Sequence, residues 1–78
     1  MMPSAFVLVN SEIGSEEDVL KALKDVPEIK EAYLVYGVYD IVVRMETDEM
    51  DKLKSLILNK IRGLTNVRST LTMLVVET

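Results

Sequence analysis

The sequence predicts a single α+β domain with the element order β-α-β-β-α-β, the ferredoxin-like arrangement. Four apolar stretches of strand length occur in this order with two stretches whose apolar residues recur at helical spacing. The 78 residues contain no linker, repeat or low-complexity segment, so we expect one domain over residues 1–78. In this fold both helices cover one face of a four-stranded antiparallel sheet and leave the other face bare.

The first two elements are predicted to be a strand and a helix. Residues 5–9 are apolar without interruption, which is typical of a strand buried on both faces. Ser15 is a suitable N-cap, and the acidic residues 16–18 suit the first turn of a helix because the helix dipole favours negative charge there. Pro27 then ends the helix.

The middle of the chain predicts a β-hairpin. Residues 29–36 form the second strand and residues 39–46 the third. The short connection through Gly37 and Val38 predicts a tight antiparallel turn, in which glycine adopts a positive φ at no steric cost.

The second half predicts a helix and a last strand. Thr47 and Asp48 can cap the helix and Gly63 can end it. Apolar residues recur at helical spacing between these ends, at Met50, Leu53, Leu56, Ile57, Ile61 and Leu64. Residues 67–76 are the fourth strand.

The bare face of the sheet is predicted to be apolar as well. Strands with one wet face alternate apolar and polar residues, whereas residues 5–9 do not alternate, and the third strand offers Val42 to the face opposite Ile41 and Val43. Exposed apolar patches of this size mark interaction sites. We therefore expect a two-fold dimer through this face, a dimeric α+β barrel, and the alternative is a monomer with an unusually apolar sheet.

The composition excludes several classes of site. The chain has no cysteine and no histidine, so a disulfide, a zinc-thiolate site and a histidine general base are excluded, and we expect no metal or other cofactor. No apolar run approaches the roughly 20 residues of a membrane span, and no signal peptide is evident, which predicts a soluble, cytoplasmic protein. The net charge of −4 without a basic stripe argues against direct binding of nucleic acid.

Two segments carry a resemblance to a known family. Residues 26–41 have the sequence VPEIKEAYLVYGVYDI, with a Pro-x-Ile before the strand and Gly-x-Tyr-Asp after it, and residues 66–75 have the sequence NVRSTLTMLV, with Thr-x-Thr. Together they resemble the effector-binding (RAM) domain of Lrp/AsnC regulators over nearly the whole chain. The departure is Asn66 where the family has glycine, and asparagine also tolerates the left-handed backbone.

The resemblance has implications for assembly. It implies a stand-alone type without the helix-turn-helix domain, because the first strand begins within a few residues of Met1. It also implies a dimer through the sheets and assembly of dimers into an octamer or similar ring. Small effectors, usually amino acids, would bind where dimers meet. Full-length Lrp/AsnC regulators are possible further partners.

The resemblance also suggests a ligand site at the hairpin and the last strand. Asp40 either caps the turn through backbone N–H groups or receives the ammonium of an amino acid. Thr70 and Thr72 point to the same face, where their hydroxyls either reflect ordinary strand propensity or bind a ligand carboxylate. The expected ligand-binding residues are Tyr36, Gly37, Val38, Tyr39, Asp40, Thr70 and Thr72.

Three functions are compatible with these observations. The leading hypothesis is a regulatory module that binds an amino acid, oligomerises and modulates Lrp/AsnC-type transcription regulators. The second is an assembly partner with no ligand of its own. The third is a small cofactor-independent enzyme, which we do not expect because no nucleophile motif, phosphate loop or paired carboxylates can be singled out.

Overall fold

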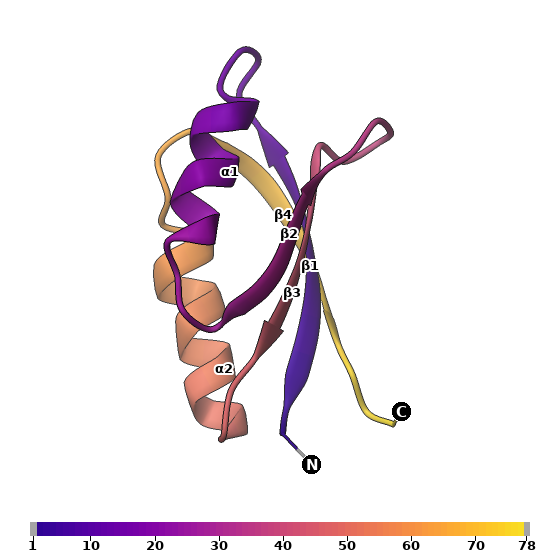
Figure 1. The fold of residues 1–78 in the computed structure, drawn as a ribbon, viewed down its shortest axis with the longest axis vertical. Coiled ribbons are helices and arrows are strands. Elements are labelled where there is room, and N and C mark those ends of the chain that lie inside the picture. Colours follow the sequence, from indigo (N-terminus) through magenta and orange to yellow (C-terminus); the bar gives the residue numbers. More distant parts are fainter. Residues whose placement is uncertain (1, 78) are drawn as a thin grey trace.

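Four strands and two helices follow one another in the predicted order in the computed structural model, which describes residues 2–77 (Figure 1). No helix within those residues is both long enough and apolar enough to cross a membrane. The elements are β1 (Ser4–Ser11), α1 (Glu16–Lys24), β2 (Ile29–Leu34), β3 (Ile41–Glu46), α2 (Met50–Leu56), one π-helical turn η1 (Ile57–Ile61) and β4 (Val67–Leu74).

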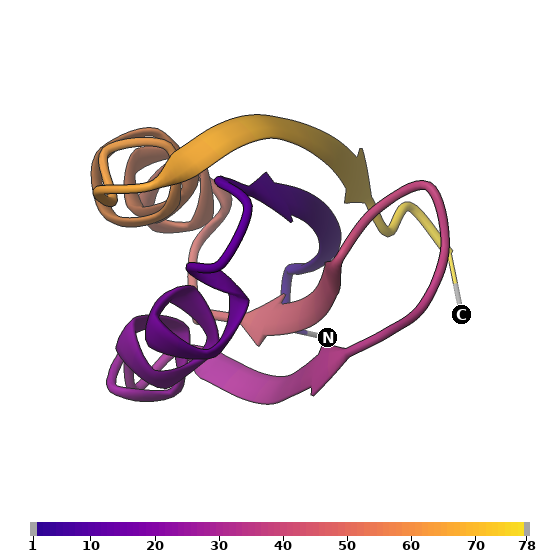
Figure 2. The same ribbon diagram turned by 90° about the horizontal axis from the view of Figure 1, so that it is seen from above.

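The strands form one antiparallel sheet in the order β2-β3-β1-β4. Figure 2 shows both helices on the same side of the strongly twisted sheet. β1 lies in the interior, with Val7 opposite Val43 of β3 and Thr72 of β4. The predicted α+β fold is therefore confirmed.

The core lies between the sheet and the helices. Alternate residues of β1 and β3 face it, because successive side chains of a strand point to opposite faces. One row of apolar side chains from each helix covers them. The row on α1 includes Leu23, and the row on α2 includes Leu53. The buried strand residues are Ala5, Val7, Val9, Ile41, Val43 and Met45.

The helix starts differ in detail from the prediction. Ser15 is the N-cap of α1, but its hydroxyl makes no capping bond; its carbonyl accepts the Val19 N–H at 3.0 Å. The Glu16 carboxylate instead accepts the N–H of Gly14 at 3.3 Å. α2 begins after Glu49, and the Thr47 hydroxyl supports this turn by donating to the Glu49 carbonyl at 2.7 Å.

The hairpin is wider than predicted. β2 stops at Leu34 and β3 starts at Ile41, so a six-residue loop, residues 35–40, replaces the expected two-residue turn, and Gly37 does not adopt a positive φ. The loop is closed by the Val35 N–H, which donates to the Asp40 carbonyl at 2.8 Å. It projects from the sheet on the side away from the helices (Figures 1 and 2). β4 likewise ends at Leu74, two residues before the predicted end.

The connection from η1 to β4 depends on two residues. A Cβ on Gly63 would lie 2.9 Å from the backbone oxygen of Asn59, so glycine fits where the chain leaves the helix. The left-handed residue is Asn66, with φ 72°, rather than Gly63. The expectation that Asn66 tolerates this backbone is confirmed.

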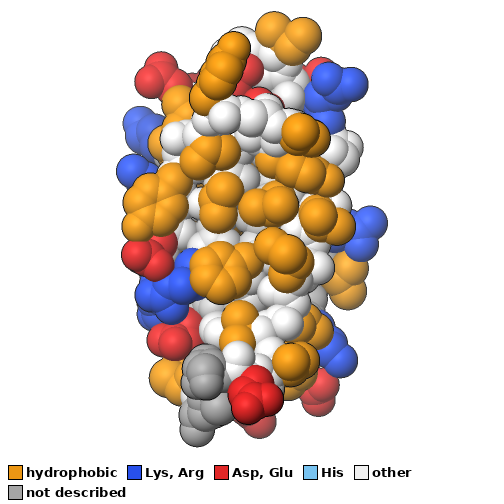
Figure 3. Space-filling view, turned by 90° about the vertical axis from the view of Figure 1, so that its right-hand side faces the viewer, with side chains coloured by type: hydrophobic (Ala, Val, Ile, Leu, Met, Phe, Trp, Pro, Cys, Tyr) orange, Lys and Arg blue, Asp and Glu red, His pale blue; other side chains and the backbone are white. Residues whose placement is uncertain are grey.

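The face opposite the helices is largely apolar and uncovered. Exposed apolar side chains of β1, β2 and β4 contribute to it, including Phe6 at 38% exposed, Tyr33 at 53%, and Leu71 and Met73 at 46% each. The half-buried Val42 of β3 lies opposite Leu8 and Tyr33 on the same face. Figure 3 shows hydrophobic side chains across the middle of this face, with charged ones at its margins. In a single copy, β1 is therefore buried on one face only, and the predicted burial on both faces requires a partner.

Candidate functional site

A hollow of about 390 Å³ lies at the end of the sheet where the hairpin loop emerges. β1, the loop before α1, the hairpin loop and β4 all contribute to it. Two of the predicted ligand-binding residues, Val38 and Asp40, line it. We call it the hairpin hollow, and its lining residues are Asn10, Ser11, Ile13, Glu16, Val38, Asp40, Arg68 and Ser69.

Asp40 fastens the hairpin loop to the end of β1. Its Oδ2 accepts the backbone N–H of Ser11 at 3.0 Å and the Ser11 hydroxyl at 3.3 Å, while its own N–H donates to the Val9 carbonyl at 3.0 Å. The Asp40 carboxylate thus bonds to the end of β1, 29 residues away, rather than to an N–H group of its own turn. A carboxylate has about four lone-pair positions, so these two bonds leave acceptor capacity for a ligand.

Charges of both signs surround the hairpin hollow. The carboxylates of Asp40 and Glu16 share it with the guanidinium of Arg68. Arg68 Nε lies 3.9 Å from Glu12 Oε1, and both side chains are more than half exposed, so this pair is weak. The hollow thus offers acceptors for a cationic group and a donor for an anionic one.

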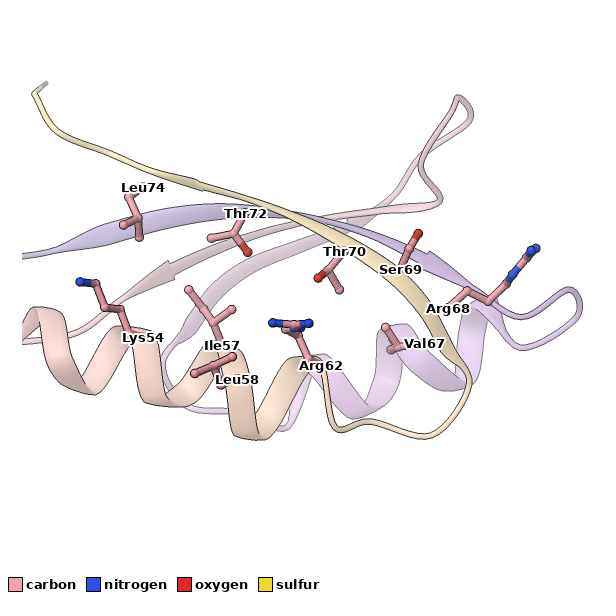
Figure 4. A pocket seen from close by; sticks show the side chains of 10 residues that line it. All are labelled: Lys54, Ile57, Leu58, Arg62, Val67, Arg68, Ser69, Thr70, Thr72 and Leu74. Atoms are coloured by element: carbon pink, nitrogen blue, oxygen red, sulfur yellow. The ribbon is translucent and has the colours of Figure 1, made fainter.

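A second and larger hollow runs between β4 and the helix α2–η1, with a volume of about 730 Å³ (Figure 4). Thr70 and Thr72 line it, and they share one face of β4, as predicted, because they pair with the inward-facing Val9 and Val7. We call it the helix groove, and its lining residues are Lys54, Ile57, Leu58, Arg62, Val67, Arg68, Ser69, Thr70, Thr72 and Leu74.

The predicted site residues are therefore divided between two places. Asp40 and Val38 line the hairpin hollow, Thr70 and Thr72 line the helix groove, and the other three, Tyr36, Gly37 and Tyr39, line neither. Arg68 and Ser69 line both, so the two hollows are neighbours along β4. Sequence reasoning missed these two residues and the helix groove's other two cations, Lys54 and Arg62. The signal for that pair was their spacing on one row of the predicted helix.

A polar cluster lies at the margin of the bare sheet face. Arg44 donates through Nε to Glu31, which also accepts the Tyr33 hydroxyl at 2.8 Å. The bond from Arg44, followed by the bond from Tyr33, lowers the pKa of the Glu31 carboxyl below its usual value. The hydrogen bond that Tyr33 makes to Glu31 raises the pKa of Tyr33, and the bond that Arg44 makes to Glu31 raises the pKa of Arg44.

The family model of the Lrp/AsnC ligand binding domain matches residues 4–78. The chain belongs to the Lrp/AsnC family. Among curated relatives, the HTH-type transcriptional regulator FL11 of Pyrococcus horikoshii is 36% identical over 74 residues, which are 95% of this chain and 48% of the relative. The FL11 regulator of Pyrococcus furiosus is 33% identical over 73 residues. This Lrp/AsnC domain thus spans about half the length of the curated relatives it matches.

Two solved structures of similar proteins have the same fold. The crystal structure of FFRP-DM1 superposes with a TM-score of 0.91 at 41% identity, covering 97% of this chain and 100% of that one. Escherichia coli AsnC superposes with a TM-score of 0.89 at 25% identity, covering 97% of this chain and 52% of AsnC. The family resemblance inferred from the hairpin and Thr-x-Thr segments is confirmed.

Proposed function

We propose that this Lrp/AsnC domain is a regulatory module that binds an amino acid and whose assembly responds to that ligand. The observation that carries the proposal is the hairpin hollow, in which Asp40 and Arg68 offer opposite charges within about 390 Å³. The description of the family domain as ligand-binding supports it, as does the role of the FL11 relatives as transcriptional regulators. A regulator of this kind acts in the cytoplasm and is not an enzyme.

The chemistry of the hollow matches a zwitterion. The Asp40 carboxylate, held by Ser11, would accept an α-ammonium group, and the Arg68 guanidinium would donate to the α-carboxylate. Both contacts are charge-assisted, and Asp40 is only partly exposed, which strengthens its contact relative to open water. Ile13 and Val38 would then contact the ligand's side chain.

The remaining predicted contacts extend this site. We propose that the loop residues Tyr36, Gly37 and Tyr39 approach the ligand where copies meet. Tyr36 is fully exposed in the single copy, so a neighbouring copy is needed to bring it against a bound molecule. Thr70 and Thr72, one hollow further along β4, are proposed to donate to a carboxylate.

Assembly supplies the regulatory output. We propose that the bare sheet faces of two copies form a two-fold dimer, and that the exposed apolar residues of the hairpin loop join dimers into rings. Ligand binding where dimers meet changes the distribution of assemblies only through a difference in affinity between the assembled and separate states. The assemblies could include full-length Lrp/AsnC regulators.

The uncovered apolar face also supports a second candidate, an assembly partner with no ligand of its own. Such a chain would form mixed oligomers with a DNA-binding relative and dilute its DNA-binding domains. Co-purification with a relative, together with the absence of any ligand effect on that complex, would favour this candidate.

Calorimetric titration with each of the twenty amino acids tests the proposal, because the ligand's identity is open. We expect one or a few to bind, and Asp40→Asn to weaken binding by about 10-fold or more, the loss of one hydrogen bond to a charged group. The amide oxygen still accepts from Ser11, so the loop should stay closed. Asp51→Asn, an exposed change on α2, is the matched control and should bind normally.

Light scattering with and without the bound amino acid tests the regulatory step. We expect the distribution of assemblies to shift at saturation. An unchanged distribution would contradict the coupling, and a lack of binding by all twenty would contradict the amino-acid proposal itself.

A further inference from the structure

The helix groove has a charge opposite to that of the whole chain. Lys54, Arg62 and Arg68 line it, and no aspartate or glutamate of residues 2–77 does. The chain as a whole carries a net charge of −4. Three cations gathered around about 730 Å³ therefore make a local positive region that attracts anions.

The two helix cations belong to one row. Lys54, Leu58 and Arg62 are spaced four residues apart, next to the buried row Leu53, Ile57 and Ile61. The π-helical turn, in which the Arg62 N–H donates to the Ile57 carbonyl at 3.1 Å, continues this row. Figure 4 shows the Arg62 side chain extending from the helix toward β4, whereas Arg68 points outward at the far end.

Among the described residues, neither helix cation has an acidic partner within 4.0 Å. Within residues 2–77, the four ion pairs up to 4.0 Å involve Arg44 twice, Lys52 and Arg68, but not Lys54 or Arg62. Across the groove, the hydroxyls of Thr70 and Thr72 make no hydrogen bond to another group of that same part of the chain. The groove therefore presents cations on one wall and unused hydroxyl donors on the other.

We infer that the helix groove binds a small dicarboxylate, with one carboxylate near Lys54 and the other near Arg62. The spacing of eight residues between these cations corresponds to about 12 Å along an α-helix, and their long side chains can lean toward the two ends of a shorter molecule. Ile57 and Leu58 lie between them and provide an apolar floor for a short methylene chain. The Thr70 and Thr72 hydroxyls donate to carboxylate oxygens from the opposite wall.

The spacing of the donors favours this ligand over a phosphate group. A single phosphate is bound best where several donors converge on one point, as at a cluster of arginines. Here the two unpaired cations are separated by the apolar side chain of Leu58. Two separate anionic groups joined by an apolar spacer match that arrangement.

This site shares the Thr70 and Thr72 hydroxyls with the extended amino-acid site, but its cations are Lys54 and Arg62 and it does not involve Asp40. Asp40 does not line the helix groove, so a ligand without an ammonium group should bind there. The inference stands without the proposed function, and the two can fail separately.

Titration with glutarate, followed by calorimetry and by amide shifts in NMR, tests the inference. We expect glutarate to bind and to shift the resonances of Thr70 and Thr72. Butyrate, with one carboxylate, and inorganic phosphate should each bind about 3- to 5-fold more weakly, because each can reach only one of the two exposed cations. Added salt should weaken glutarate binding, since the groove is open to solvent.

Matched variants distinguish binding in the helix groove from a general effect of removing a positive charge from the chain. Lys54→Ala and Arg62→Ala should each weaken glutarate binding about 3- to 5-fold, because both cations are exposed. Lys60→Ala removes the same charge from an exposed position of the same helix that does not line the groove, and should leave binding unchanged. Arg62→Lys should retain most of the affinity, and Asp40→Asn all of it.

Three results would overturn the inference. These are no binding of glutarate, equal binding of butyrate or phosphate, and equal losses in Lys60→Ala and Arg62→Ala. Loss of amino-acid binding in Asp40→Asn with unchanged glutarate binding would support both sites as separate.

Discussion

At the scale of single residues, the Glu31 carboxylate shows how a polar cluster is tied to the apolar sheet face. It accepts from Arg44 Nε and from the Tyr33 hydroxyl, and the Arg44 bond is the larger reason why its pKa lies below the ordinary 4.5. Because this pKa is lowered in the folded state, the ionised Glu31 carboxylate contributes its full stabilisation above the unfolded-state pKa. This stabilisation is lost as the pH falls through the folded-state value.

We therefore expect Arg44→Gln to raise the pKa of Glu31 toward 4.5. NMR titration of the Glu31 side-chain carboxyl measures this directly. Glu46→Gln is the matched control, because Glu46 lies 3.8 Å from the same guanidinium and makes no contact with Glu31 that shifts its pKa. A Glu31 pKa unchanged by Arg44→Gln would show that the guanidinium does not hold this carboxylate in solution.

At the scale of elements, the connection into β4 depends on one left-handed residue. Asn66 has φ 72°, and its carbonyl accepts the Glu12 N–H at 2.8 Å, which ties the connection to the loop before α1. A left-handed backbone costs residues with a Cβ about 1–2 kcal/mol, less for asparagine and nothing for glycine. The position therefore accepts only a short list of residues at low cost.

We expect Asn66→Ala to destabilise the fold by about 1 kcal/mol, or about 4–8 °C in Tm for a domain of this size. Asn66→Gly should stay within about 0.5 kcal/mol of the parent, because glycine adopts this backbone freely. Urea unfolding at one fixed protein concentration measures both, since self-association makes stability depend on concentration. Equal losses in the two variants would show that the asparagine side chain, not the backbone, is what matters.

The elements differ in how far they follow from the sequence. The helices and strands were predictable within a few residues because burial periodicity is a local property, as the rows through Leu53 and Val43 illustrate. The hairpin turn was wrong because Val35, Tyr36 and Tyr39 have strand-like side chains although they lie in a loop. The point at which the hydrogen-bonded pairing of β2 and β3 ends depends on tertiary contacts, such as the bonds from Ser11 to Asp40.

The residues of the site also differ in how far they follow from the sequence. The hairpin and Thr-x-Thr residues were found through their motifs, but their separation into two hollows depends on how β4 lies against α2–η1. Arg62 and Arg68 escaped notice because a cation on a helix or an edge strand is ordinary until the packing brings it to a cavity. Only the three-dimensional arrangement of β4 and the helix places both residues at the wall of one groove.

At the scale of the whole molecule, a single copy leaves the apolar sheet face exposed to solvent. This face is continuous across all four strands, and the hairpin loop projects on the same side (Figures 1 and 3). A chain of 78 residues buries only about 60% of its unfolded surface, so a second sheet packed on this face adds stability that one core of this size lacks. Charges at the margins are compatible with the polar rim of an interface.

Two leucine substitutions test whether copies meet through this face. Leu71 lies on it and is 46% exposed, whereas Leu58 lies on the helix layer and is 56% exposed. In a face-to-face dimer, Leu71→Glu would bury an unpaired carboxylate in each copy, at a cost of about 3 kcal/mol or more and over 100-fold in the dissociation constant. We expect sedimentation over a concentration series to show a monomer for Leu71→Glu and the parent assembly for Leu58→Glu. A parent-sized assembly in both variants would contradict pairing through the sheets, and dissociation by Leu58→Glu alone would move the interface to the helix layer.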